Sequence, residues 1–207
     1  MDAKNKYSYC WNIRLKKYFW DYAFLLGIAG FIVAVDQLSK YLVRTQIPFA
    51  GSWSPFEWLE PYIRIVHWQN TGAAFGMLQG FGLVFAILAV IVSIAILYYF
   101  PRVPSNEWAI RLAMAMQLGG ALGNLIDRIT VGTVTDFVSV GTFAVFNVAD
   151  SCISVGTVIL ILAVWDSERR QKKLALANPK QDPASIDPPE PPKQEEQAPD
   201  SENHPLE

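Results

Sequence analysis

This sequence contains little charge and few of the residues that metal sites and serine hydrolases need. Only 17% of its 207 residues are charged, and it has two cysteines and two histidines. Cys10 and Cys152 lie far apart without CxxC or cysteine–histidine spacing, so we expect two unrelated thiols and no metal site. No GxSxG or HExxH motif occurs, and we interpret His67 as a surface residue. These absences exclude a serine–histidine hydrolase and a zinc protease.

Positive charge is also scarce where a nucleic-acid binder would need it. The net charge of −2 divides unevenly, because residues 1–173 carry 15 Lys and Arg against 11 Asp and Glu, whereas residues 174–207 carry 2 against 8. No basic patch is interleaved with aromatic residues, so we expect no nucleic-acid partner. The tail beyond Ala177 holds eight prolines and eight acids, a composition typical of a disordered segment, and it indicates no function.

Apolar segments, in contrast, are long and frequent. Hydrophobic residues make up 52% of the chain, too many for an ordinary soluble domain. Residues 82–100 contain no charge, and as a helix this segment is about 28 Å long, close to the thickness of a bilayer core. Similar segments cover residues 24–35 (continued to 43), 108–126 and 143–165. We therefore predict an α-helical integral membrane protein with four transmembrane helices within residues 20–166. The first helix lacks a clear cleavage site, so we expect a retained anchor.

The placement of Lys and Arg predicts the orientation of these helices. Basic residues are concentrated in residues 1–20, around the link after residue 100 and after residue 165, so we expect the segments 1–19 and 167–207 to be cytoplasmic. The other two links then face outward, and residues 45–80 are long enough to fold. Within them "YIRIVHWQN" at 62–70 alternates apolar and polar residues, which predicts a strand and a small extracytoplasmic β-sheet on the membrane surface.

Four aspartates lie close to the predicted helices, where a charged group is costly and usually marks function or has a partner. Asp36 and Lys40 are four residues apart on one helix face, so we expect a structural ion pair. Asp127 adjoins Arg128, and we expect a structural pair or a helix cap there. The other two aspartates have no cation nearby in the sequence.

These two are Asp136 and Asp150. Asp150 belongs to a polar stripe that we expect to face the bundle interior, formed by Asn147, Asp150, Ser151, Ser154 and Thr157. Gly119 and Gly123 favour close approach of the third helix to its neighbours. Asp136 lies in "TVTDFVSV", which we interpret as a strand that folds back over the start of the fourth helix.

Two carboxylates brought together in a dry environment share one proton, which is the chemistry of aspartyl proteases. The spacing alone leaves an alternative to this pair, in which Asp136 is simply a turn residue on a polar loop. A proton-coupled transporter that uses the same acids as a relay is a second hypothesis, although the acids cluster at one face and no inverted repeat is evident. A non-enzymatic scaffold is a third, and it leaves the paired acids unexplained.

Five motifs then occur in order along the chain: "DQLSK" at 36–40, "NTGAAFG" at 70–76, "GGALGNLIDR" at 119–128, "VTDF" at 134–137 and "FNVADS" at 146–151. Together they resemble lipoprotein signal peptidase, the signal peptidase II family of bacterial inner membranes, over about residues 20–165. Single motifs are weak, whereas the ordered set is highly specific. Two departures are visible: only 13 residues separate Asp136 from Asp150, and the acidic tail is an addition to the family core.

The resemblance implies an intramembrane aspartyl endopeptidase without metal or cofactor, whose catalytic residues correspond to Asp136 and Asp150. The supporting positions that it implies are Asn70, Asn124, Asp127, Arg128 and Asn147, with Asp36 and Lys40 as an architectural pair. Among them Arg128 would donate to a substrate carbonyl and Asn147 would position the aspartates. The implied substrate is a diacylglyceryl-modified prolipoprotein, cleaved on the N-terminal side of the lipidated cysteine. It would be bound from above by the outer strand region and "NTGAAFG". We expect a monomer that contacts membrane lipid in a bacterial inner membrane, with its site near the outer face.

Overall fold

The computed structural model describes residues 3–72 and 79–177 of the chain. Its elements in chain order are α1 (Ala3–Gln46), β1 (Ser52–Trp53), the 3-10 helix η1 (Glu57–Leu59), β2 (Ile63–Asn70), α2 (Gly82–Tyr99), the 3-10 helix η3 (Phe100–Arg102), α3 (Trp108–Thr130), β3 (Val134–Val140) and α4 (Val148–Ala177). One compact unit comprises residues 1–169, and the described part of the second is only the end of α4. The predictions for the tail beyond Ala177, and for most of "NTGAAFG", lie outside the described residues.

Four helices are long and apolar enough to span a membrane, which confirms the predicted fold class. The spans are Tyr18–Gln46, Gly82–Arg102, Trp108–Thr130 and Val148–Leu174. In the third, 56% of the apolar window is buried by the rest of the protein, against 22% or less in the others, so α3 is the central helix. The α1 helix continues to Gln46, so the first two residues of the predicted outer link 45–80 belong to the helix.

Glycines on α3 let its two neighbours approach closely, as the sequence predicted. A Cβ atom added at Gly119 would lie 2.8 Å from Ile32 of α1, and one at Gly123 would lie 2.7 Å from the Asp36 carboxylate. On the side toward α4, a Cβ at Gly120 would lie only 2.5 Å from the carbonyl oxygen of Ala149. Glycine weakens a helix by about 1 kcal/mol relative to alanine, but here it allows backbone contact that no larger residue permits.

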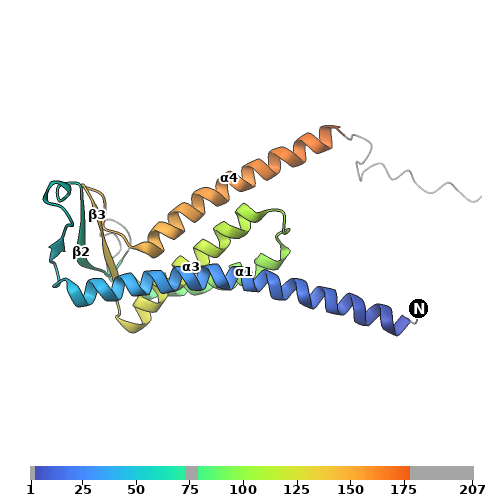
Figure 1. Cartoon of the computed structure of the whole chain (residues 1–207), viewed down its shortest axis with the longest axis horizontal. Helices are drawn as coiled ribbons and strands as arrows, with labels where there is room; N and C mark the ends of the chain where they lie inside the picture. The colour runs from blue at the N-terminus through green and yellow to red at the C-terminus, as the bar shows by residue number, and fades with distance from the viewer. Residues whose placement is uncertain (1–2, 73–78, 178–207) are drawn as a thin grey trace, which may run out of the picture. The chain divides into compact units, whose positions relative to one another are not determined.

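The three strands form one antiparallel sheet in the order β1-β2-β3. Figure 1 shows β2 and β3 at the end of the bundle where α1 ends and α4 begins. Between Ile65, which pairs with Val138, and Trp68, which pairs with Asp136, β2 uses one residue more than β3. Side chains alternate between the two faces of a strand, so this extra residue exchanges the faces of the positions that follow it. As a result Asn70, opposite Val134, lies on the same sheet face as Asp136.

A tight turn connects α3 to β3 and thereby sets the height of Asp136 above the helices. Gly132 has a φ of +85°, the left-handed conformation that commonly ends a helix, and its N–H donates to the Asp127 carbonyl. The chain then runs through β3 and returns along it, where Val138 and Phe146 exchange backbone hydrogen bonds. This short return delivers the start of α4 directly beside β3.

Candidate active site

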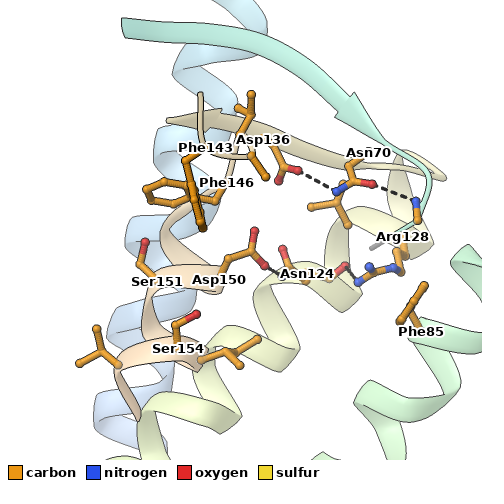
Figure 2. Close-up of a pocket in the computed structure, with 16 residues that line it drawn as sticks. Asn70, Phe85, Asn124, Arg128, Asp136, Phe143, Phe146, Asp150, Ser151 and Ser154 are labelled. Atoms are coloured by element: carbon orange, nitrogen blue, oxygen red, sulfur yellow. Dashed lines mark hydrogen bonds between the residues drawn. The ribbon is translucent and has the colours of Figure 1, made fainter. Parts of the chain in front are cut away.

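A cavity of about 520 Å³ opens where β3, α3 and the start of α4 meet. Its walls are mostly apolar, with aromatic side chains from α2 and from the return loop. Figure 2 shows the carboxyl groups of Asp136 and Asp150 pointing into it from β3 and from α4. The remaining polar side chains that line it are those of Asn70, Asn124, Arg128, Ser151 and Ser154. The two aspartates that lacked a cation in the sequence therefore face one cavity.

Asp136 is held by two asparagine side chains. It is 1% exposed, its Oδ2 accepts a hydrogen bond from Asn70 Nδ2 at 2.9 Å, and its Oδ1 accepts one from Asn147 Nδ2 at 2.7 Å. The N–H of Gly72 donates to Asn70 Oδ1, which turns the amide nitrogen of Asn70 toward the carboxylate. Burial, and after it the negative charge of Asp150, raise the pKa of Asp136 to about 7, against the effect of the two amide donors.

Asp150 is fixed by the geometry of the first turn of α4. Asn147 caps this helix: its Oδ1 accepts the N–H of Asp150 at 2.9 Å, while the N–H of Asn147 donates to Asp150 Oδ2 at 3.3 Å. This reciprocal arrangement is a capping box built from asparagine and aspartate. Asn124 Nδ2 donates to Asp150 Oδ1 at 2.7 Å. Because Asn147 contacts both aspartates, it determines how their carboxyl groups face each other.

A buried charged cluster lies directly beneath this pair. Lys40 and Asp36 form the predicted ion pair, at 2.8 Å and with both side chains 0% exposed. Asp36 Oδ1 also accepts the N–H of Ala149 at 2.9 Å, so the pair joins α1 to the start of α4. An acidic group at a helix N-terminus is favoured by the helix dipole. The cluster therefore supports the backbone on which Asp150 stands.

The expected pairing of Asp127 with Arg128 is wrong. Within the part of the chain that the structure describes, Asp127 forms ion pairs with Lys40 and Arg44 of α1, each at 3.4 Å. Neighbouring residues on a helix point about 100° apart, so Asp127 faces α1 while Arg128 faces the cavity. The N–H of Thr135 also donates to Asp127 Oδ2 at 2.9 Å, which connects the cluster to β3.

Three further members of this network, Gln37, Arg44 and Thr135, were not predicted from the sequence. Gln37 Nε2 donates to Asp127 Oδ1 and to the Gly123 carbonyl, and Arg44 donates to Thr135 Oγ1 at 3.0 Å. A signal for Arg44 was present, because it follows Lys40 by four residues on the same helix face. For Gln37 and Thr135 the sequence offers no comparable signal.

Arg128 stands at the side of the cavity next to α2. Its guanidinium lies 5.5 Å from the centroid of the Phe85 ring, and its Nη1 donates to the Asn124 carbonyl at 3.4 Å. Of the five N–H donors of an arginine, this hydrogen bond to the Asn124 carbonyl uses one. An arginine so placed is able to donate to a carbonyl oxygen of a peptide bound between α2 and the aspartates.

The polar stripe on α4 faces the neighbouring helices, as expected. Ser151 donates to the Asn147 carbonyl, Ser154 lines the cavity, and Thr157 accepts a hydrogen bond from Gln117 of α3 at 3.3 Å. Our expectation that His67 is a surface residue is wrong: it is 7% exposed, and its Nδ1 lies 2.9 Å from the Ile47 carbonyl. It lies within the register shift of β2, which turns it inward. The thiol of Cys152 is free, and the described residues contain no group of three or more possible metal-binding side chains.

Comparisons with known proteins show which families and structures this chain resembles. A family model described as signal peptidase (SPase) II matches residues 28–166. Curated lipoprotein signal peptidases of Staphylococcus aureus, such as those of strains JH9 and Newman, are 33% identical over 162 residues, covering 76% of this chain and 96% of the relative. A bacterial membrane enzyme solved in meso at 2.3 Å is similar in structure, with a TM-score of 0.64, 30% identity, and coverage of 76% of this chain and 92% of that one. A second, solved at 1.9 Å, has a TM-score of 0.61 and 33% identity over 68% of this chain and 91% of its own.

Proposed function

The chain belongs to the signal peptidase II family, and on this premise we propose that it removes the signal peptide from diacylglyceryl-modified prolipoproteins, with Asp136 and Asp150 as the catalytic pair. One observation carries the proposal: the buried carboxyl group of Asp136 and the half-buried one of Asp150, joined through Asn147, face a single cavity with apolar walls in a membrane-spanning bundle.

The proposed reaction is hydrolysis with one proton shared between the two carboxyl groups. The raised pKa of Asp136 supports this state, because its carboxyl group can hold the shared proton near neutral pH. The ionised carboxylate takes a proton from a water molecule, whose oxygen bonds to the carbonyl carbon of the peptide. The protonated carboxyl gives its proton to the carbonyl oxygen. Transfer of a proton to the amide nitrogen then allows the C–N bond to break, leaving a new carboxyl group and a new amine.

The supporting residues would act on the aspartates or on the substrate backbone. Asn70 and Asn147 hold Asp136, and Asn124 holds Asp150, through the hydrogen bonds described above. Arg128 donates to a substrate carbonyl on the side toward α2. Cleavage occurs on the N-terminal side of the lipidated cysteine, whose acyl chains remain in the lipid. We propose that the chain works as a monomer, because all of these residues come from one chain.

The distribution of basic residues supports one orientation in the membrane. Lys and Arg flank the spans at the chain termini and around the α2–α3 link, which favours a cytoplasmic location for both ends. The sheet and the aspartate pair then lie near the outer face of a bacterial inner membrane. A lipidated precursor can reach that depth by lateral diffusion within the bilayer.

Cleavage of a purified lipidated precursor in detergent tests this function. Asp136→Asn and Asp150→Asn, each alone, are expected to lower the rate by about a hundred- to ten-thousandfold, as expected for loss of a general acid or base. Asp166→Asn is a matched control, since Asp166 is exposed on the same helix as Asp150 and should leave the rate unchanged. Full activity in either site variant, with correct folding, contradicts the mechanism, and cleavage of an unlipidated precursor at the same rate contradicts the substrate class.

A further inference from the structure

Lys40 has an unusual environment for a lysine in a membrane helix. It is fully buried, and its Nζ lies 2.8 Å from Asp36 Oδ2, 3.0 Å from Asn124 Oδ1 and 3.4 Å from Asp127 Oδ2. An ammonium group has three N–H donors and no acceptor. Three oxygen atoms therefore match its three hydrogens. One of them belongs to Asn124, which contacts a catalytic residue rather than the charged cluster alone.

The contact with Lys40 decides which way the amide of Asn124 points. Because Lys40 only donates, the oxygen of the amide has to face it, and the nitrogen then faces Asp150 Oδ1 at 2.7 Å. The reverse orientation would direct the NH₂ group at the ammonium and the amide oxygen at a carboxylate. Asn147 Nδ2 also donates to Asn124 Oδ1, at 3.1 Å, and favours the same orientation.

The other two asparagines of the site do not depend on a side-chain cation. Asn70 is oriented by the backbone N–H of Gly72, and Asn147 by the backbone N–H of Asp150. Backbone donors come with the fold, whereas both donors to the Asn124 oxygen, Lys40 and Asn147, are side chains. Lys40 is the one of the two that cannot accept a hydrogen bond, so its substitution removes the group that excludes the reverse orientation of Asn124.

We propose that Lys40 is a positioning residue for hydrolysis: by donating to Asn124 it holds the amide N–H of that residue against Asp150, and so fixes the direction of the Asp150 carboxyl group. This inference deepens the proposed function and rests on it. It also assigns to Lys40 more than the architectural role that its pairing with Asp36 suggests. Lys40 also balances the negative charge of the cluster, and this role can be tested separately from its effect on the orientation of Asn124.

The test compares Lys40→Gln with the double variant Lys40→Gln/Asp127→Asn. Glutamine can donate or accept, so it no longer imposes an orientation on Asn124. The single variant leaves Asp36 and Asp127 facing Arg44 alone, whereas the double variant loses one acid with the base and keeps the cluster balanced. We expect both to lower kcat by about ten- to hundredfold with KM changed by less than about threefold, because misdirected catalytic groups slow the chemical step. Recovery of wild-type kcat in the double variant would show that only charge balance matters and would overturn the proposal.

A matched control and a second readout make the result decisive. Arg111→Gln also replaces a buried cation, which pairs with Asp21 at 2.6 Å outside the site, and it should leave kcat unchanged in the protein that folds. The ¹³Cγ resonance of Asp150, identified by its loss in Asp150→Asn, should shift in both Lys40 variants and not in Arg111→Gln. An unshifted resonance overturns the role of Lys40. If the wild type fails to cleave the precursor, the proposed function fails, while the resonance still reports whether Lys40 directs Asp150.

Discussion

Helix α1 carries two buried aspartates that each pair with a base, and their surroundings differ. Asp21 pairs with Arg111 of α3 at 2.6 Å, and the guanidinium lies 4.4 Å from the centroid of the Phe100 ring. The second oxygen of Asp21 has no hydrogen-bond partner among the residues that the structure describes. Asp36, about 22 Å further along the helix, pairs with Lys40, and both of its oxygens are bonded, one of them to the backbone of α4.

This difference shows that burial of an ion pair does not by itself indicate function. A buried pair is weak evidence even for stability, because desolvation offsets much of the attraction between the charges. The Asp21–Arg111 pair ends in packing against aromatic rings. The Asp36–Lys40 pair continues through Asn124 to Asp150 and so reaches the cavity. Connection to groups that line the cavity is therefore the property that separates the two regions.

The largest expected effect comes from replacing each pair as a whole. Asp21→Leu/Arg111→Met should fold with near-neutral or improved stability and retain cleavage, because apolar replacement of a buried pair is often tolerated. Asp36→Leu/Lys40→Met should lower cleavage by about a hundredfold or more, since the N–H of Ala149 loses its acceptor and Asn124 loses the ammonium donor of Lys40. Rates and unfolding midpoints of both variants, measured in one detergent, check this. Equal activity in the two would remove the distinction between the regions.

A second, smaller effect should appear in how stability depends on pH. The pKa of Asp136 is raised to about 7, chiefly by burial, whereas an aspartate in the unfolded chain titrates near ~3.9. Between these values the folded protein holds a proton that the unfolded chain has released, so stability falls as pH rises through this window. Asp136→Asn should therefore match the wild type near pH 4 and exceed it above pH 7, by on the order of a few kcal/mol.

Thermal unfolding at the two pH values measures this difference. The variant Asp21→Leu/Arg111→Met is the control, because it retains Asp136 and should keep the pH dependence of the wild type. If the stability of Asp136→Asn equals that of the wild type at both pH values, the ionised form of the Asp136 carboxyl group is not destabilised by its site.

The smallest expected effect is on stability, and it concerns the packing of α3 against α4 near Gly120 and near Gly156. Gly120→Ala would bring a Cβ atom within 2.5 Å of the Ala149 carbonyl oxygen, beside Asp150, and should destabilise the protein by about 1–3 kcal/mol. Gly156→Ala meets Ala113 and Met116 at 3.2 Å and gains helix propensity, so a change below about 1 kcal/mol is expected. Unfolding midpoints check the pair, and an equal response would mean that α3 and α4 are packed uniformly.

Much of the fold follows from local patterns in the sequence. Length and hydropathy identified the four spans, alternation identified β2, and the four-residue spacing identified the pair of Asp36 and Lys40. Each of these signals lies within one element, where the period of the structure determines which side chains meet. The motifs identified Asp136 and Asp150 as members of one site, and the structure places them at one cavity.

Contacts between elements were harder to predict. Asp127 was assigned to its neighbour Arg128, but its partners lie on α1, more than eighty residues away in the sequence. Uninterrupted alternation in β2 would also put Gln69, not Asn70, on the face of Ile65 and Asp136. The extra residue between Ile65 and Trp68 reverses this assignment, and nothing in the sequence marks it. Helix pairing and strand register depend on the whole fold, which is why these residues were misassigned or missed.

The extra residue between Ile65 and Trp68 makes β2 one residue longer than its pairing with β3 requires. If evolution or an engineer removed a single residue between Ile65 and Asn70, the irregularity could close and the asparagine would remain opposite Val134. Removal of two residues would exceed this one-residue excess and would move Asn70 away from Asp136. A deletion of one residue between Ile65 and Asn70 is thus expected to keep the same amide beside the same acid.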